Sequence, residues 1–127
     1  MKIAEAEVIA NKVVGWCAKN LGVSKFHNGL PLVDVSYVSD FPPICGEYDT
    51  EENLIHIYTS LNRSVKCLVN TVLHEYTHYL QCTAWIFRFI AKYDIGKTGS
   101  KKNPYEIRAT ANALIYTEKC MRDLGLH

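Results

Sequence analysis

The strongest constraint on the fold comes from one long segment, residues 64–91. Its apolar side chains recur around nearly the whole circumference of a helix: Val65, Leu68, Val69, Val72, Leu73, Tyr76, Leu80, Trp85, Ile86 and Phe89. A helix that is apolar on most sides has to be covered on most sides. The pattern therefore predicts one continuous helix in the middle of the domain, with Asn62 or Ser64 as its cap.

The part of the chain before this segment changes its hydrophobic period once. From Ile3 to Leu21 apolar residues recur every three or four positions, which predicts a helix ended by Gly22. Residues 30–38 alternate and predict a strand, which the sequence Asp40-Phe41-Pro42-Pro43 ends. Two further short strands, 44–48 and 54–58, flank a polar stretch and predict a hairpin.

The C-terminal part contains one more helical pattern. Residues 92–103 are rich in lysine, glycine and serine and predict an exposed loop. The last helix is expected to begin at Asn103-Pro104 and to end within 119–123, before Gly125. The 127 residues thus predict a single α+β domain, residues 1–127: an N-terminal helix, a small three-stranded sheet, a buried central helix and a C-terminal helix.

Charge and cysteine usage exclude several classes of function. Fourteen basic residues face 13 acidic ones, so no long-range field would gather nucleic acid or an anionic membrane surface. No apolar run approaches the roughly 20 residues that span a bilayer, and the N-terminus lacks the apolar core of a signal peptide. The five cysteines form no CxxC pair, which favours free thiols in a reducing compartment. We therefore expect a cytoplasmic protein with neither a nucleic-acid nor a membrane partner.

Residues 74–78 of the predicted central helix form an HExxH sequence. His74 and His78 lie four positions apart, so their Cβ atoms share one helix face about 5–6 Å apart. Two imidazoles so placed can converge on one Zn²⁺ ion. Glu75 is turned roughly 100° away and can act on the ion's water as general base, then as general acid. The alternative is a pair of hydrogen-bonded core histidines, but three unpartnered ionisable groups would be costly in an apolar helix.

A catalytic zinc site needs a third protein ligand. The candidates are Asp94, Glu106, Glu118, His127, His27, His56 and Cys45. Glu106 is favoured because it lies in the first turn of the last helix, which could run antiparallel beside the central one. Asn103 and Glu106 also have the spacing of a capping box, a purely structural role. The small residues Ala109, Ala111 and Ala113 favour the ligand role, because they allow the two helices to approach closely.

The sequences HEYTHYLQ and NPYEIRA resemble those of the gluzincin metallopeptidases, in particular the minigluzincins and related small phage and bacterial peptidases. The resemblance extends over the whole order of elements. It implies that His74, His78 and Glu106 bind zinc and that Glu75 is the general base and acid. It also implies that an edge strand, residues 53–58, lies over the cleft and pairs with an extended peptide.

The chain departs from the larger gluzincins in one respect. Where these have an acid to orient a histidine ligand, this chain has Thr110, so Thr110 or Asn70 is the expected partner of a ligand imidazole. Tyr105, Arg108 and Tyr116 are candidates to stabilise the oxyanion, with no feature that selects one of them.

The residues thus predict a zinc metallopeptidase, most simply an endopeptidase, acting on a peptide or protein substrate. Two alternatives stay open: a binding or regulatory module that holds zinc without turnover, and a hydrolase of non-peptide amides. Glu75 argues against the binding module, because a purely structural zinc site has no use for a base.

Overall fold

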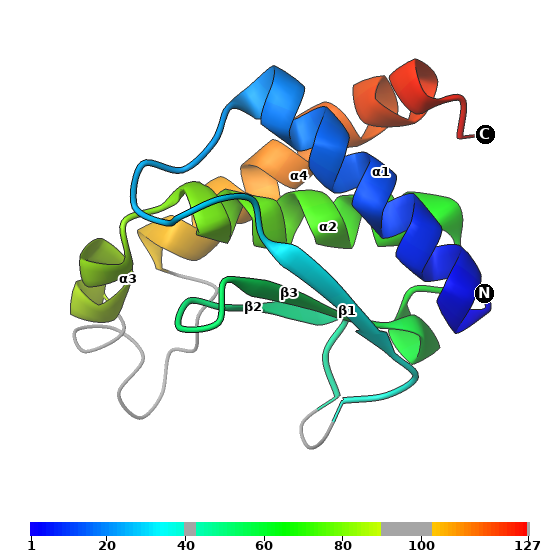
Figure 1. Cartoon of the computed structure of the whole chain (residues 1–127), viewed down its shortest axis with the longest axis horizontal. Helices are drawn as coiled ribbons and strands as arrows, with labels where there is room; N and C mark the ends of the chain where they lie inside the picture. Colours follow the sequence, from blue (N-terminus) through cyan, green and yellow to red (C-terminus); the bar gives the residue numbers. More distant parts are fainter. Residues whose placement is uncertain (40–42, 90–102, 127) are drawn as a thin grey trace.

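The computed structural model describes residues 1–39, 43–89 and 103–126, and it has the predicted α+β architecture (Figure 1). The long helix α2 (Val65–Leu80) lies in the middle of the molecule. The sheet lies along one side of α2, while α1 (Ile3–Leu21) and α4 (Pro104–Leu124) pack against the helix from other directions.

Helix α1 follows the predicted periodicity. Its buried residues recur at helical spacing and form one face: Ala6, Ile9, Ala10, Val13, Val14, Trp16 and Cys17. This face packs on α2 and also contacts the first strand. The helix ends where Gly22 adopts φ 89°, a conformation that glycine reaches without steric cost.

The sheet has the order β1-β3-β2, with bounds Leu32–Ser36 for β1, Gly46–Asp49 for β2 and Leu54–Tyr58 for β3. Strands β2 and β3 form the predicted antiparallel hairpin, and β1 pairs with β3 in parallel. The parallel pairing makes β3 the central strand. The expectation that residues 53–58 form an edge strand over the cleft is therefore wrong, and β2 is the edge on that side. Residues 40–42, part of the segment predicted to end the first strand, lie outside the described ranges.

The prediction of one continuous helix over residues 64–91 is also wrong. Ser64 caps α2 as expected, since its Oγ accepts a hydrogen bond from the backbone N–H of Cys67. Gln81, however, is extended (φ −83°, ψ 150°), and a separate short helix α3 covers Thr83–Phe89. No glycine or proline marks this break in the sequence. Residues 90 and 91 lie outside the described ranges.

Helix α4 begins and ends close to the predicted positions. Pro104 occupies the first turn, and Gly125 closes the helix in the left-handed conformation, its N–H donating to the carbonyl of Arg122. Asn103 is the N-cap residue but makes no side-chain cap bond. The loop predicted over 92–103 falls almost entirely outside the described residues.

The core lies between α2, α1, α4 and the inner face of the sheet. From α2 come large fully buried side chains, among them Leu68, Leu73, Tyr76 and Tyr79. The hydroxyl of Tyr76 donates to the carbonyl of Gly22, and that of Tyr79 donates to the carbonyl of Gly29. These two bonds fasten the connection between α1 and β1 to the central helix. Within the described ranges, no helix has the length and apolar character to cross a membrane.

Candidate metal centre

The helical register of α2 brings His74 and His78 onto one face, with ring centroids 5.0 Å apart. Glu106, in the first turn of α4, reaches both rings. Its Oε2 lies 3.3 Å from Nε2 of His74, and its Oε1 lies 2.6 Å from Nε2 of His78. One ligand atom from each of these residues lies within 4.8 Å of the others, and no other group of three such residues is found in the described ranges. We refer to them as the triad.

The close approach of α4 to α2 depends on small side chains, as the sequence suggested. Ala109 and Ala113 are fully or almost fully buried between the helices, whereas Ala111 is exposed and plays no part in the contact. The Glu106 carboxylate is directed at the two imidazoles. In a capping box it would instead bond to the backbone at the start of its own helix. The structure therefore favours the ligand geometry for Glu106.

The charges of the triad are strongly coupled. Burial alone would raise the pKa of Glu106, but hydrogen bonds from His74 and His78 outweigh it and lower the pKa to about 2. For His78, burial alone would lower the pKa, but the hydrogen bond to Glu106 and the nearby Glu75 charge outweigh it, and the net shift is upward. Glu106 is thus held as an anion beside the imidazoles.

Glu75 lies next to the triad and is only 7% exposed. Burial raises the pKa of its carboxyl, and the neighbouring His78 and His74 imidazoles offset only part of this effect. A carboxyl group with a raised pKa takes up a proton more readily near neutral pH than an exposed one does. Glu75 is therefore suited to accept and return a proton at the edge of the triad.

A hollow of about 550 Å³ opens onto the triad. Besides the triad and Glu75, it is lined by the edge strand β2 and by the apolar side chains of Ile44, Ile86 and Phe87. Tyr105 also lines it, with its ring centroid 5.7 Å from that of His78. The triad is thus open on one side to a space that could admit a substrate.

One residue in contact with the triad was not predicted. Gln81, at the end of α2, places its Oε1 2.8 Å from Nδ1 of His78. The two expected partners are engaged differently: Thr110 is exposed on α4, and Asn70, which lines a small hollow together with His74, donates to the hydroxyl of Thr117. Gln81 lies three positions after His78, a spacing that also brings side chains together within a helix, but its second contact, with the backbone of Tyr105, joins segments far apart in the sequence and has no signal in the periodicity.

Among the described residues, none of the other candidate ligands belongs to the metal-ligand cluster. Glu118 is exposed and forms an ion pair with Lys66, and His56 pairs with Asp34 on the outer face of the sheet. His27 stacks on Tyr79. Asp94 and His127 lie outside the described residues. Cys45 lines a smaller hollow next to His74 and Glu75 but is not part of the metal-ligand cluster.

The oxyanion candidates are likewise divided. Tyr105 lines the triad hollow, whereas Arg108 lines a different hollow bounded by Trp85, and Tyr116 contacts the ring of Trp16.

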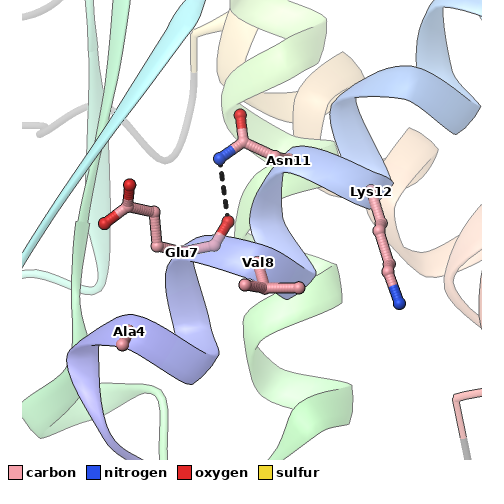
Figure 2. A pocket seen from close by; sticks show the side chains of 5 residues that line it. All are labelled: Ala4, Glu7, Val8, Asn11 and Lys12. Carbon is pink, nitrogen blue, oxygen red and sulfur yellow. Dashed lines mark hydrogen bonds between the residues drawn. The ribbon is translucent and has the colours of Figure 1, made fainter.

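A further hollow of about 650 Å³ on α1 is lined by Ala4, Glu7, Val8, Asn11 and Lys12 (Figure 2). There the Asn11 amide donates to the backbone carbonyl of Glu7 in its own helix, and the lining residues do not form a ligand cluster.

The donor set of the triad fits a zinc ion. Two imidazole nitrogens and one carboxylate, open on one side, are the combination found in catalytic zinc sites. Tetrahedral coordination with bonds of about 2.0–2.1 Å places neighbouring ligand atoms roughly 3.3 Å apart. The distance of 3.3 Å between Nε2 of His74 and Oε2 of Glu106 matches this separation, whereas the 2.6 Å between Nε2 of His78 and Oε1 of Glu106 is that of a hydrogen bond and would lengthen on coordination.

Comparison of the chain with protein-family models, with curated proteins and with solved structures gives no match. Its function therefore has to be inferred from the chemistry of the site.

Proposed function

We propose that the protein is a zinc-dependent metallopeptidase of the gluzincin type, with His74, His78 and Glu106 as zinc ligands and Glu75 as general base and acid. One observation carries the proposal. A carboxylate from a separate helix converges on the Nε2 atoms of both histidines of an HExxH sequence, beside a buried glutamate. A purely structural zinc site would not need Glu75.

The chain's own groups supply the proton transfers. Bound zinc would make a water molecule more acidic and would polarise a carbonyl group. Glu75 accepts the proton of the attacking water, and its raised pKa favours this uptake near neutral pH. The protonated Glu75 then donates to the amine that leaves. The apolar side chains of Ile44, Ile86 and Phe87 line part of the hollow beside these groups.

The edge strand β2 is the element proposed to hold an extended peptide. The backbone N–H of Tyr58 donates to the carbonyl of Cys45, so these two opposite residues form a hydrogen-bonded pair. Along an antiparallel ladder, hydrogen-bonded and non-hydrogen-bonded pairs alternate. By that alternation the backbone groups of Gly46 and Tyr48 point away from β3, toward the free edge. Both residues line the triad hollow. A peptide added as a further strand would therefore pass the triad.

An intracellular location belongs to the same proposal. All five cysteines are unpaired, including the exposed Cys45 and Cys67. Free thiols of this kind are typical of a reducing compartment.

The test compares cleavage of a peptide library by the wild-type protein and by Glu75→Gln, with zinc content measured in both. We expect equal zinc content and loss of cleavage in the variant only. Glu52→Gln, a change in the exposed turn between β2 and β3, is the matched control and should cleave like the wild type. Zinc binding without cleavage by the wild type would favour the binding module. Cleavage that survives in Glu75→Gln would exclude the proposed role of Glu75.

A further inference from the structure

Gln81, the residue at which α2 ends, contacts a triad histidine from outside the hollow. It is 7% exposed, and its extended backbone turns the side chain back toward the helix that it leaves. Its backbone N–H donates to the carbonyl of His78, and its side-chain Oε1 lies 2.8 Å from Nδ1 of the same histidine.

The orientation of the Gln81 amide is fixed by its second contact. Its Nε2 donates to the backbone carbonyl of Tyr105 at 3.0 Å. A carbonyl oxygen can only accept, so the amide nitrogen has to face Tyr105 and the amide oxygen has to face His78. An amide oxygen also can only accept, so Nδ1 of His78 has to carry the proton. In a neutral ring, the lone pair then lies on Nε2, which points into the triad.

The same amide connects the two elements that carry the ligands. Tyr105 immediately precedes Glu106, so the bond from Gln81 anchors the first turn of α4 at the residue before the carboxylate ligand. Glu106 in turn lies 2.6 Å from His78. The contacts form a closed ring from His78 through Gln81 and Tyr105 to Glu106 and back to His78. One buried side chain thus constrains both the tautomer of one ligand and the position of another.

We propose that Gln81 is a positioning residue of the zinc centre, which holds His78 in the Nδ1–H tautomer and sets the separation of His78 from Glu106. This role rests on the zinc binding that is part of the proposed function, and does not depend on peptide cleavage. Groups that hold a metal-binding histidine from outside typically change metal affinity 10–100-fold when they are removed.

The test measures the zinc dissociation constant of Gln81→Met by competition with a chromogenic chelator. Methionine keeps the length of the side chain and removes both hydrogen bonds, so we expect a 10–100-fold weaker affinity. Gln81→Glu keeps an oxygen facing Nδ1 but puts its second oxygen against the Tyr105 carbonyl, so it should recover only the part of the loss that comes from the His78 contact. Asn62→Ala is the matched control. Asn62 is a fully buried amide bonded to the carbonyls of Cys45 and Tyr58, without contact to a ligand. We expect this control to lose thermal stability and keep its zinc affinity.

A second measurement does not depend on the folding of any variant. Long-range ¹H–¹⁵N correlation of the histidine rings in the zinc-loaded wild type should show His78 protonated at Nδ1. The opposite tautomer would overturn the proposal, and so would a Gln81→Met protein that is folded and binds zinc as tightly as the wild type. A wild type that takes up no zinc would overturn both the centre and this role. A wild type that binds zinc but cleaves no peptide would overturn the proposed function and leave the role of Gln81 standing.

Discussion

Glu106 is the residue on which the triad depends most, because it is the only described group that joins α4 to both imidazoles. We expect Glu106→Gln to weaken zinc binding by more than the 10–100-fold typical of losing an outer contact, because an anionic ligand is replaced by a neutral one. Chelator competition measures the change. Glu118→Gln, on the exposed face of the same helix, should bind zinc like the wild type, and equal affinities of the two variants would exclude Glu106 as a ligand.

The coupled charges of the triad predict a pH dependence for the zinc-free protein. The pKa of Glu106 is lowered to about 2, so its stabilising effect is present above its unfolded pKa and is lost as pH falls toward 2. The pKa of His78 is raised, so its effect is present below its unfolded pKa and is lost as pH rises through the folded value.

Thermal unfolding in EDTA across pH tests this dependence. The wild type should be most stable in mildly acidic solution, where both charges are present. Glu106→Gln should flatten the profile on both sides, because it removes the partner of His78. An unchanged profile in that variant would show that the pair makes no net contribution to folding.

At the residue scale, the sequence was sufficient for the residues whose geometry is local. His74, Glu75 and His78 follow from the helical repeat. Glu106, on a separate helix, was favoured among seven candidates by its place at the start of that helix, and the structure brings its carboxylate to both imidazoles. The role of Gln81 could not be predicted in the same way, because it depends on a carbonyl of a distant segment as well as on its spacing from His78.

Among the elements, the edge strand β2 is positioned by one glycine. A Cβ atom on Gly46 would lie 2.8 Å from the carbonyl oxygen of His56 and 2.8 Å from Cγ2 of Thr71. The first of these is backbone of the central strand, so β2 itself would have to move. We expect Gly46→Ala to lower the free energy of unfolding by about 1–3 kcal/mol, seen as a reduced Tm.

Gly15→Ala is the control for this change. Gly15 lies within α1, and a methyl group at this position would meet no atom of another element within 4 Å, so alanine should be neutral or stabilise the helix by up to about 1 kcal/mol. If Gly46→Ala unfolds at the same temperature as the wild type, the edge strand tolerates displacement. Peptide cleavage by that variant would then report on whether the position of β2 matters to the site.

The elements that were predicted correctly are those with a local signal: the period of α1, the hairpin of β2 and β3, and the glycine after α4. Two predictions failed for physical reasons. Apolar residues continue beyond Gln81, so hydrophobic period alone could not reveal the end of α2. The parallel pairing of β1 with β3 joins strands that are not consecutive, and no turn sequence encodes it.

For the whole molecule, we expect zinc binding and folding to be linked, because the proposed ligands lie on two helices that come together only in the folded chain. An ion bound only by the folded chain adds about 2.7 kcal/mol of stability at a free concentration 100 times its dissociation constant. We expect the wild-type Tm to rise with added zinc and to fall again with EDTA. His74→Ala should show a much smaller rise, and an equal rise in both proteins would place the binding elsewhere.

The hydroxyl bonds of Tyr76 and Tyr79 to the connection between α1 and β1 bear on how freely the HExxH sequence can vary. Tyr76 occupies one of the two positions that the motif leaves unspecified, yet it is fully buried and bonded. In a library randomised at residues 74–79 and selected for folding alone, without metal, Tyr76 and Tyr79 should be retained more often than His74. Tyr76, at a position that the motif leaves unspecified, would then be required for folding, whereas the specified His74 would be required only for binding the metal.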